Sequence, residues 1–183
     1  MRPPRQRRIT LPPRRCDLLA SSAGVTMRRC KMGDHHLLKR SLAAFLLGAV
    51  AVLVVHQPAI GLCHLLGLTP LTAYSLAGRP PWGVPVFLSL TFWGGIWAIP
   101  IGLILDRLPR GWPYWVGAAL LGSLPTNLTS ILVILPLKGL PMSVFFQAVG
   151  AVTGFTANGV WGLGFAALWH WWNGRAAAAR MPA

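Results

Sequence analysis

The amino-acid sequence predicts an all-α integral membrane protein, a bundle of four transmembrane helices with both termini in the cytoplasm. Three observations lead to this fold class. The 183-residue chain is 54% hydrophobic and 11% charged, whereas soluble domains average about 25% charged residues. Its apolar residues gather in four long stretches, and a helix needs about 20 such residues to cross a bilayer. Its basic residues concentrate on one side of these stretches, which sets their orientation.

The charged residues and cysteines exclude two other classes of protein. Lys and Arg number 17, against only three carboxylates, Asp17, Asp34 and Asp106, so the formal net charge is +14. A soluble fold with so few acidic groups and so much apolar surface is not expected. Three Cys residues are too few for a disulfide-stabilised scaffold.

Residues 1–40 form a basic leader that we expect to be disordered and cytoplasmic. They hold 11 of the 17 Lys and Arg residues and show little hydrophobic periodicity, so they bury too little apolar surface to offset the entropy of ordering. Three alternatives stay open: an organellar transit peptide, a mis-assigned start ahead of Met27 or Met32, and a nucleic-acid-binding arm. Because no aromatic residues interleave with the arginines, we expect no nucleic-acid partner.

The body of the chain, residues 41–172, divides into four predicted spans. They lie at about 41–66, 84–105, 114–135 and 147–172, and a short cytoplasmic tail, 173–183, follows them. Segments rich in Pro and Gly separate the spans, as is typical of loops. An alternative for the first span is a signal peptide cleaved at Ala59-Ile60-Gly61, but the apolar run resumes at Leu62, which favours one long helix.

Basic residues orient the four spans. With the N-terminus inside, the leader, the loop of Arg107 and Arg110, and the tail carry 15 Lys and Arg residues. The opposite side carries two, Arg79 and Lys138. Because cytoplasmic loops are enriched in basic residues, this bias places both termini in the cytoplasm.

Small residues recur at helical spacing within the spans and predict the faces on which the helices pack. Close approach of backbones is the main source of helix association in lipid. The predicted packing residues are Gly94, Gly102, Gly122, Gly150, Gly154 and Gly162. The ridge of Gly150 and Gly154 is also a candidate surface for homo-oligomers or for a membrane protein partner.

Neutral polar residues recur at one depth and form a predicted intramembrane polar layer. With a rise of about 1.5 Å per residue, one such residue in each span lies about 20–22 Å from the cytoplasmic end of its helix. The members are His56 with Gln57, Thr91, Asn127 and Asn158. They either hydrogen-bond one another and fix the register of the bundle, or line a small cavity that opens outward.

The sequence discloses no catalytic, cofactor or metal site. His56 and His64 lie about 80° apart on an ideal helix, so we expect neither a bis-His haem nor a metal site. Motifs of hydrolases, zinc peptidases and phosphate-binding loops are missing from the sequence. A membrane enzyme without a recognisable motif remains the weakest of the functional hypotheses.

Three motifs carry a resemblance to a known family. They are His56-Gln57-Pro58, the segment from Pro81-Trp82-Gly83 to Gly95-Ile96-Trp97, and Asn158-Gly159-Val160-Trp161-Gly162. Over residues 37–172 the chain resembles an uncharacterised family of small four-span proteobacterial inner-membrane proteins. The resemblance implies a multi-pass protein of the bacterial inner membrane, and it implies no activity and no site residue.

Two main hypotheses of function follow. The first is a non-enzymatic accessory or partner-binding component of the membrane. The second is a permeation unit for a small solute or ion, which would use the polar layer of His56, Asn127 and Asn158. Removing the polar side chains separates the two, because only permeation requires them for passage of a solute.

Overall fold

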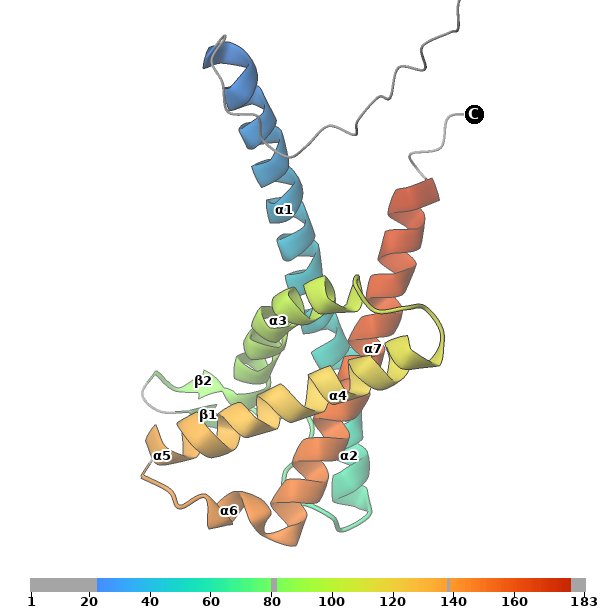
Figure 1. Ribbon diagram of the computed structural model, residues 1–183. Coiled ribbons are helices and arrows are strands. Elements are labelled where there is room, and N and C mark those ends of the chain that lie inside the picture. Colours follow the sequence, from blue (N-terminus) through green and yellow to red (C-terminus); the bar gives the residue numbers. More distant parts are fainter. Residues whose placement is uncertain (1–22, 80–81, 138, 179–183) are drawn as a thin grey trace, which may run out of the picture. The chain divides into compact units, whose positions relative to one another are not determined.

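The computed structural model describes residues 23–79, 82–137 and 139–178, and these residues are mostly helical (Figure 1). The chain divides into two compact units, Met1–His36 and Leu37–Ala183. The second unit contains the predicted membrane body. Residues 1–22 of the predicted leader, Lys138 and the last five residues of the tail lie outside the described residues.

The first predicted span is a continuous helical run in three parts. Helix α1 covers Ala23–Ala51, a π-helical turn η1 covers Val52–His56, and helix α2 covers Gln57–Leu65. The helix begins well before residue 41, so residues 23–40 of the segment that we expected to be disordered are helical.

Each π turn ends two residues before a proline. The turn η1 ends at His56, ahead of Pro58, and the second turn, η2 (Ser130–Ile134), lies ahead of Pro136. A proline ring inside a helix lacks an N–H and clashes with the carbonyl one turn earlier. A wider turn at that place relieves the clash, and π turns are frequent at functional sites.

The remaining described elements follow the predicted spans and loops. A two-residue antiparallel ladder, β1 (Gly78–Arg79) with β2 (Val84–Pro85), lies in the loop before α3 (Val86–Leu105). The third span is α4 (Trp112–Thr129), η2 and the short α5 (Leu135–Leu137). After α6 (Ser143–Phe146), α7 covers Ala148–Ala178 and therefore extends into the predicted tail.

Among the residues that the structure describes, three helical segments are long and apolar enough to cross a membrane. They are His36–Leu65, Val86–Leu105 and Trp112–Leu137. Helix α7 has sufficient length at 31 residues, but Gly, Thr and Asn are frequent in its sequence. The structure is therefore that of a helical protein with three candidate spans, and α7 is the counterpart of the fourth predicted crossing.

Helices α1 and α4 each carry a stripe of large apolar side chains that are exposed. On α1, Leu42, Leu46 and Val50 are each between 43% and 56% exposed. On α4, Leu120, Leu124 and Leu128 repeat the same four-residue spacing and are similarly exposed. Stripes of this size are unfavourable in water, and hydrocarbon lipid tails are the solvent that suits them.

Helices α4 and α7 are in the closest backbone contact, through glycines at predicted packing positions. A Cβ atom on Gly122 would lie 2.7 Å from the Cα of Gly162, and one on Gly162 would lie 2.3 Å from the carbonyl oxygen of Ala118. Gly154 of α7 packs against the side chain of Asn127. These small residues allow the two helices to approach to backbone contact.

The other predicted packing glycines lie against different neighbours. Gly94 faces Val52, and a Cβ on Gly48 would lie 2.8 Å from the carbonyl oxygen of Gly94, which brings α1 and α3 together. Gly102 packs against Trp169 of α7. Gly150 is half-buried in the first turn of α7, where its N–H donates to the carbonyl of Gln147.

Asp106 joins three helices at their predicted cytoplasmic end. It forms an ion pair with Arg40 of α1 and not with its neighbour Arg107, whose guanidinium donates to the carbonyl of Leu103. The Asp106 Oδ1 atom also accepts hydrogen bonds from Trp169 Nε1 at 3.0 Å and from Asn173 Nδ2 at 3.2 Å, both on α7. This carboxylate therefore links α1, the end of α3, and α7.

Candidate intramembrane binding site

Hydrogen bonds connect two helices at the level of the predicted polar layer. His56 of η1 and Asn158 of α7 line the same cavity. Asn158 Nδ2 donates to Asn127 Oδ1 of α4 at 3.0 Å, and Asn127 Nδ2 donates to the carbonyl of Ser123 at 2.8 Å. His56 and Asn127 are buried. Three of the predicted polar residues therefore lie together.

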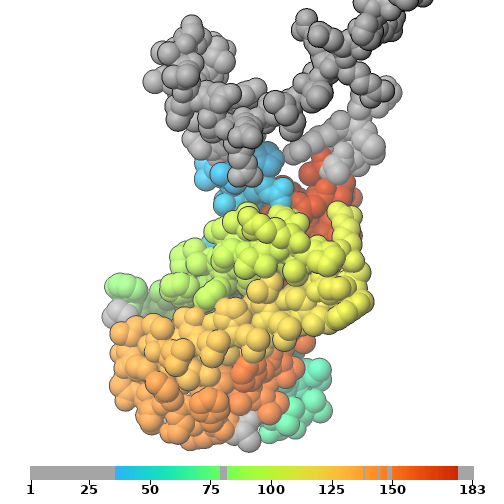
Figure 2. All heavy atoms as spheres, in the orientation of Figure 1, coloured from blue at the N-terminus to red at the C-terminus, as the bar shows by residue number. Residues whose placement is uncertain are grey.

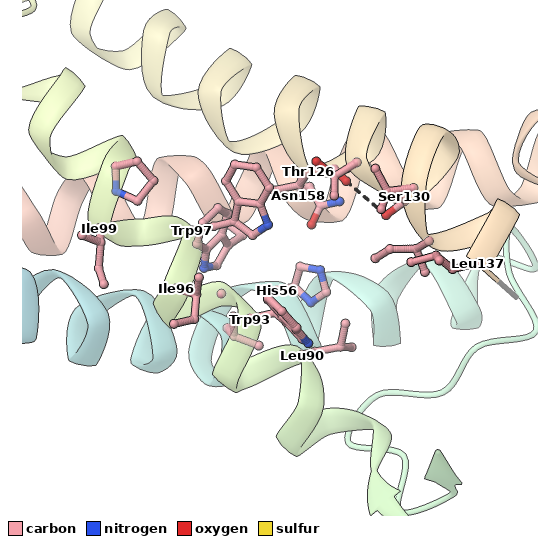
Figure 3. Close-up of a pocket in the computed structure, with 17 residues that line it drawn as sticks. His56, Leu90, Trp93, Ile96, Trp97, Ile99, Thr126, Ser130, Leu137 and Asn158 are labelled. Carbon is pink, nitrogen blue, oxygen red and sulfur yellow. Dashed lines mark hydrogen bonds between the residues drawn. The ribbon is translucent and has the colours of Figure 1, made fainter. Parts of the chain in front are cut away.

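A cavity of about 800 Å³ adjoins this chain of hydrogen bonds. Figure 3 shows Thr126, Ser130 and Asn158 grouped on one side of it, with Leu90, Trp93 and Ile96 of α3 on the other. Its lining is contributed by η1, α3, α4, η2, α5 and α7: Val52, His56, Leu90, Trp93, Gly94, Ile96, Trp97, Ile99, Pro100, Thr126, Thr129, Ser130, Val133, Ile134, Leu137, Asn158 and Trp161. Sites for small molecules commonly have volumes of about 300–1,000 Å³ and mostly apolar walls.

The cavity has a polar wall and an exposed apolar rim. Helices α3 and α4, which contribute facing walls, are in contact and are both seen on the face drawn in Figure 2. Trp93 on α3, and Val133 and Leu137 beyond α4, line the cavity while 48–81% of each residue is exposed. Side chains of this kind face lipid in a membrane protein. The cavity is therefore bordered by exposed apolar side chains of α3, η2 and α5.

The hydroxyls of the polar wall are satisfied within their own helices. Thr126 Oγ1 donates to the carbonyl of Gly122 at 2.6 Å, and Ser130 Oγ donates to the carbonyl of Thr126 at 3.1 Å (Figure 3). Their oxygens keep lone pairs that can accept a further hydrogen bond. None of the lining residues is Asp, Glu, Lys or Arg. The polar wall therefore offers a ligand hydrogen-bonding groups but no charged side chain with which to form an ion pair.

Two members of the predicted layer lie outside this site. The hydroxyl of Thr91 donates to the carbonyl of Phe87 in its own helix at 2.8 Å, and Thr91 does not line the cavity. Gln57 is buried on a different side of the helix, where its Oε1 accepts from the backbone N–H of Tyr74 at 2.8 Å. The Tyr74 hydroxyl donates to the carbonyl of Leu53 at 2.7 Å. Gln57 therefore anchors the loop after α2.

Two polar side-chain atoms in the described part of the chain are buried without a hydrogen-bond partner: His56 Nδ1 and Gln57 Nε2. A buried polar atom without a partner costs about 1–3 kcal/mol, so such atoms are uncommon and require an explanation. His56 Nδ1 is thus an unsatisfied polar atom enclosed within the protein.

The aromatic wall of the cavity was not predicted from the sequence. Trp93 and Trp97 of α3 line it (Figure 3), and so does Trp161 of α7, whose Nε1 donates to the carbonyl of Gly48 at 3.1 Å. Spacing could have indicated this wall, because residues 93 and 97 lie four apart on one face of α3. Their direction toward the polar layer depends on tertiary packing.

The site has no constellation for metal binding. Within the described ranges, no three His, Cys, Asp or Glu side chains gather closely enough to hold an ion. Comparisons with known proteins give no relative: no family model, no curated protein and no solved structure matches the chain. The function is therefore inferred from the geometry of the site.

Proposed function

We propose that the chain is a four-span protein of the bacterial inner membrane, with both termini in the cytoplasm, that acts by non-enzymatic binding within the bilayer as an accessory or partner-binding component. In this arrangement α7 is the fourth crossing, antiparallel to α4. The positive-inside rule supports the orientation, since Arg107 and Arg110 then share a compartment with the leader and with Arg175.

The single observation that carries the proposal is the cavity. It combines a volume of about 800 Å³, an uncharged lining and exposed apolar residues at its rim. The hydrogen bond from Asn158 to Asn127 holds the polar wall in place, and a wall that is held before binding loses less conformational entropy on binding. No group with the arrangement of a nucleophile and a base lies among the cavity-lining residues.

Site-specific photocrosslinking in native membranes tests the proposal. Thr129 lines the cavity, while Leu120 lies on the exposed stripe of the same helix. A photoreactive benzoylphenylalanine at position 129 is expected to give one discrete adduct, with a protein or a lipid-soluble molecule. The same residue at position 120 is expected to give only diffuse adducts with bulk lipid. Identical diffuse adducts from both positions would contradict binding in the cavity.

The second candidate function is permeation of a small solute or ion. The observation that favours it is the polar group formed by His56, Asn158 and Asn127, in which Asn158 donates to Asn127 and His56 lines the same cavity as Asn158. The double variant His56→Ala with Asn158→Leu separates the two functions. Under permeation, proteoliposomes of the unchanged protein pass glycerol or potassium faster than empty liposomes, and the double variant loses this flux.

Under the binding function, the flux of the unchanged protein equals that of empty liposomes. The double variant then lowers the abundance of the protein or dissociates its complexes, because it removes the hydrogen bond between α7 and α4 and the buried imidazole of η1. His170→Phe is the control, since His170 is exposed near the end of α7 and does not line the cavity.

A further inference from the structure

We propose that exposed basic side chains around Asp106 bind the headgroup of an anionic phospholipid. This surface, the basic band, consists of Lys39, Arg107, Arg110 and Arg175. It is separate from the cavity, whose lining contains none of these residues. The inference therefore goes beyond the proposed function and does not rest on binding in the cavity.

The ion pair of Asp106 brings the first three members of the basic band together. Asp106 pairs with Arg40 of α1, and Lys39 is the residue next to Arg40 on that helix. Arg107 directly follows Asp106 at the end of α3, and Arg110 lies in the loop that leads to α4. Basic residues of α1 and of the loop between α3 and α4 therefore lie at the same end of the helices.

Helix α7 brings the fourth member to this end. Asn173 Nδ2 donates to Asp106 Oδ1 at 3.2 Å, and Arg175 lies two residues further along the helix. The Arg175 guanidinium lies 4.4 Å from the centre of the Trp171 ring. Because an aromatic ring attracts a cation but carries no net charge, this contact leaves the positive charge of Arg175 without a counter-charge.

The positive charges of the basic band exceed the carboxylates available to them. Asp106 is the one Asp or Glu residue between positions 35 and 183, and Arg40 is its ion-pair partner. Arg107 donates to the carbonyl of Leu103 at 3.0 Å, which is a neutral acceptor. All four residues of the band are exposed, so an anion can reach them.

Exposed apolar side chains lie beside these charges. Lys39 and Leu42 are three positions apart on α1, a spacing that places two side chains on one face of a helix, and Leu42 is 56% exposed. Leu103, whose carbonyl accepts from Arg107, is 38% exposed. A ligand that fits this surface combines a negative charge with hydrocarbon.

An anionic phospholipid has this combination of groups. Its phosphate lies at the membrane interface, where each nearby Lys or Arg contributes about fivefold in affinity, and its acyl chains would lie along the exposed stripe of α1. A zwitterionic phospholipid has the same acyl chains, but the basic band repels its ammonium group. A free inorganic anion has no hydrocarbon part and would leave the apolar side chains without a partner.

Titration of the purified full-length chain with two matched lipids tests this inference. In dodecyl maltoside micelles, native mass spectrometry separates the lipid-free chain from its lipid adducts. Dioleoylphosphatidylglycerol is the anionic probe, and dioleoylphosphatidylethanolamine is the zwitterionic control with the same acyl chains. We expect phosphatidylglycerol to bind at a concentration about 25-fold lower than phosphatidylethanolamine, the contribution of two basic side chains to one headgroup.

Substitutions locate the binding of the lipid on the chain. The double variant Arg107→Gln with Arg110→Gln is expected to bind phosphatidylglycerol no better than phosphatidylethanolamine. Arg107→Lys with Arg110→Lys keeps both charges and should keep the preference. Arg79→Gln is the control, because it removes one charge from β1, in the loop before α3, and should change neither affinity. If the Gln double variant does not fold, Arg175→Gln should still weaken phosphatidylglycerol binding about fivefold.

Three results would overturn the inference. Equal affinities of the two lipids for the unchanged chain would show that the headgroup charge is not recognised. A preference that Arg79→Gln removes and that both Gln variants of the basic band keep would place the anion elsewhere. Displacement of phosphatidylglycerol by a molar excess of inorganic phosphate would show that the band binds charge alone.

The outcome is independent of the proposed function. Since the cavity lining contains no Asp, Glu, Lys or Arg, a preference for the anionic lipid that depends on Arg107 and Arg110 does not arise in the cavity. If the two lipids bind alike, while the Gln double variant loses an acidic protein that co-purifies with the unchanged chain, the basic band is a docking surface for protein and the lipid is excluded.

Discussion

Replacing Gly162 by Ala perturbs the contact on which the α4–α7 pair depends. The new Cβ would lie 2.3 Å from the carbonyl oxygen of Ala118 and 3.0 Å from the Cα of Gly122. An ordinary carbon–oxygen contact is about 3.3 Å or longer, so the helices must separate by about 1 Å. Because the obstructing atoms belong to the backbone, no side-chain rotation can relieve the clash. Overpacking of this kind costs about 1–3 kcal/mol.

Gly159 supplies the matched control on the same helix. Its added Cβ would meet nothing closer than 3.8 Å, so Gly159→Ala brings the change in helix propensity, up to about 1 kcal/mol, without the clash. Unfolding by sodium dodecyl sulfate in mixed micelles measures both variants. The free energy of unfolding should be about 1–3 kcal/mol lower for Gly162→Ala than for Gly159→Ala. Equal values for the two variants would refute the assigned packing of α4 on α7.

Two further substitutions test contacts at the opposite ends of the helices. Asp106→Asn removes the negative charge that pairs with Arg40 and accepts from Trp169. It should lower the free energy of unfolding by about 1 kcal/mol at low salt and by less at high salt. A loss of stability that salt does not alter would contradict this role of the carboxylate. Tyr74→Phe removes the hydrogen bond to the carbonyl of Leu53 and should speed cleavage of the loop after α2 by an added protease, at most about tenfold. An unchanged cleavage rate would mean that the hydroxyl does not anchor the loop.

Hydrophobic composition and turn residues predicted most of the helices. The apolar runs at 84–105 and 114–135 correspond closely to α3 and to α4 with η2, because clusters of Pro and Gly mark the loops between helices, while the single prolines Pro100 and Pro125 lie inside them. The glycines at positions 122 and 162 were predicted as packing residues and do lie in a helix contact. Small size is a property of the residue itself, so it can be read before the partner helix is known.

Which residues belong to the polar site could be determined only from the tertiary structure. The rise of a helix gives the height of a residue but not the direction in which its side chain points. Thr91 has the predicted height and bonds to its own helix, whereas Asn127 and Asn158 meet between helices. The ion pair of Arg40 with Asp106 joins residues 66 apart, and no local pattern favours Arg40 over the adjacent Arg107.

The tryptophans of the cavity illustrate the same limit. In a membrane helix Trp is common at the interfaces with water, and sequence alone does not separate such a residue from one that lines a site. Trp93 and Trp97 acquire their role because α3 passes the polar wall of η1 and α7. That arrangement depends on close contact at Gly94, where Val52 of η1 packs against the backbone of α3.

The location of the C-terminus tests the central proposal of four crossings most directly. Three crossings from a cytoplasmic N-terminus would leave it in the periplasm, and a fourth through α7 returns it to the cytoplasm. A green fluorescent protein fused after Ala178 should fluoresce, as should one fused after Arg110, while alkaline phosphatase should be active only when fused at Tyr74 or Gly139. Phosphatase activity from the fusion after Ala178 would contradict the fourth crossing and the orientation of α7.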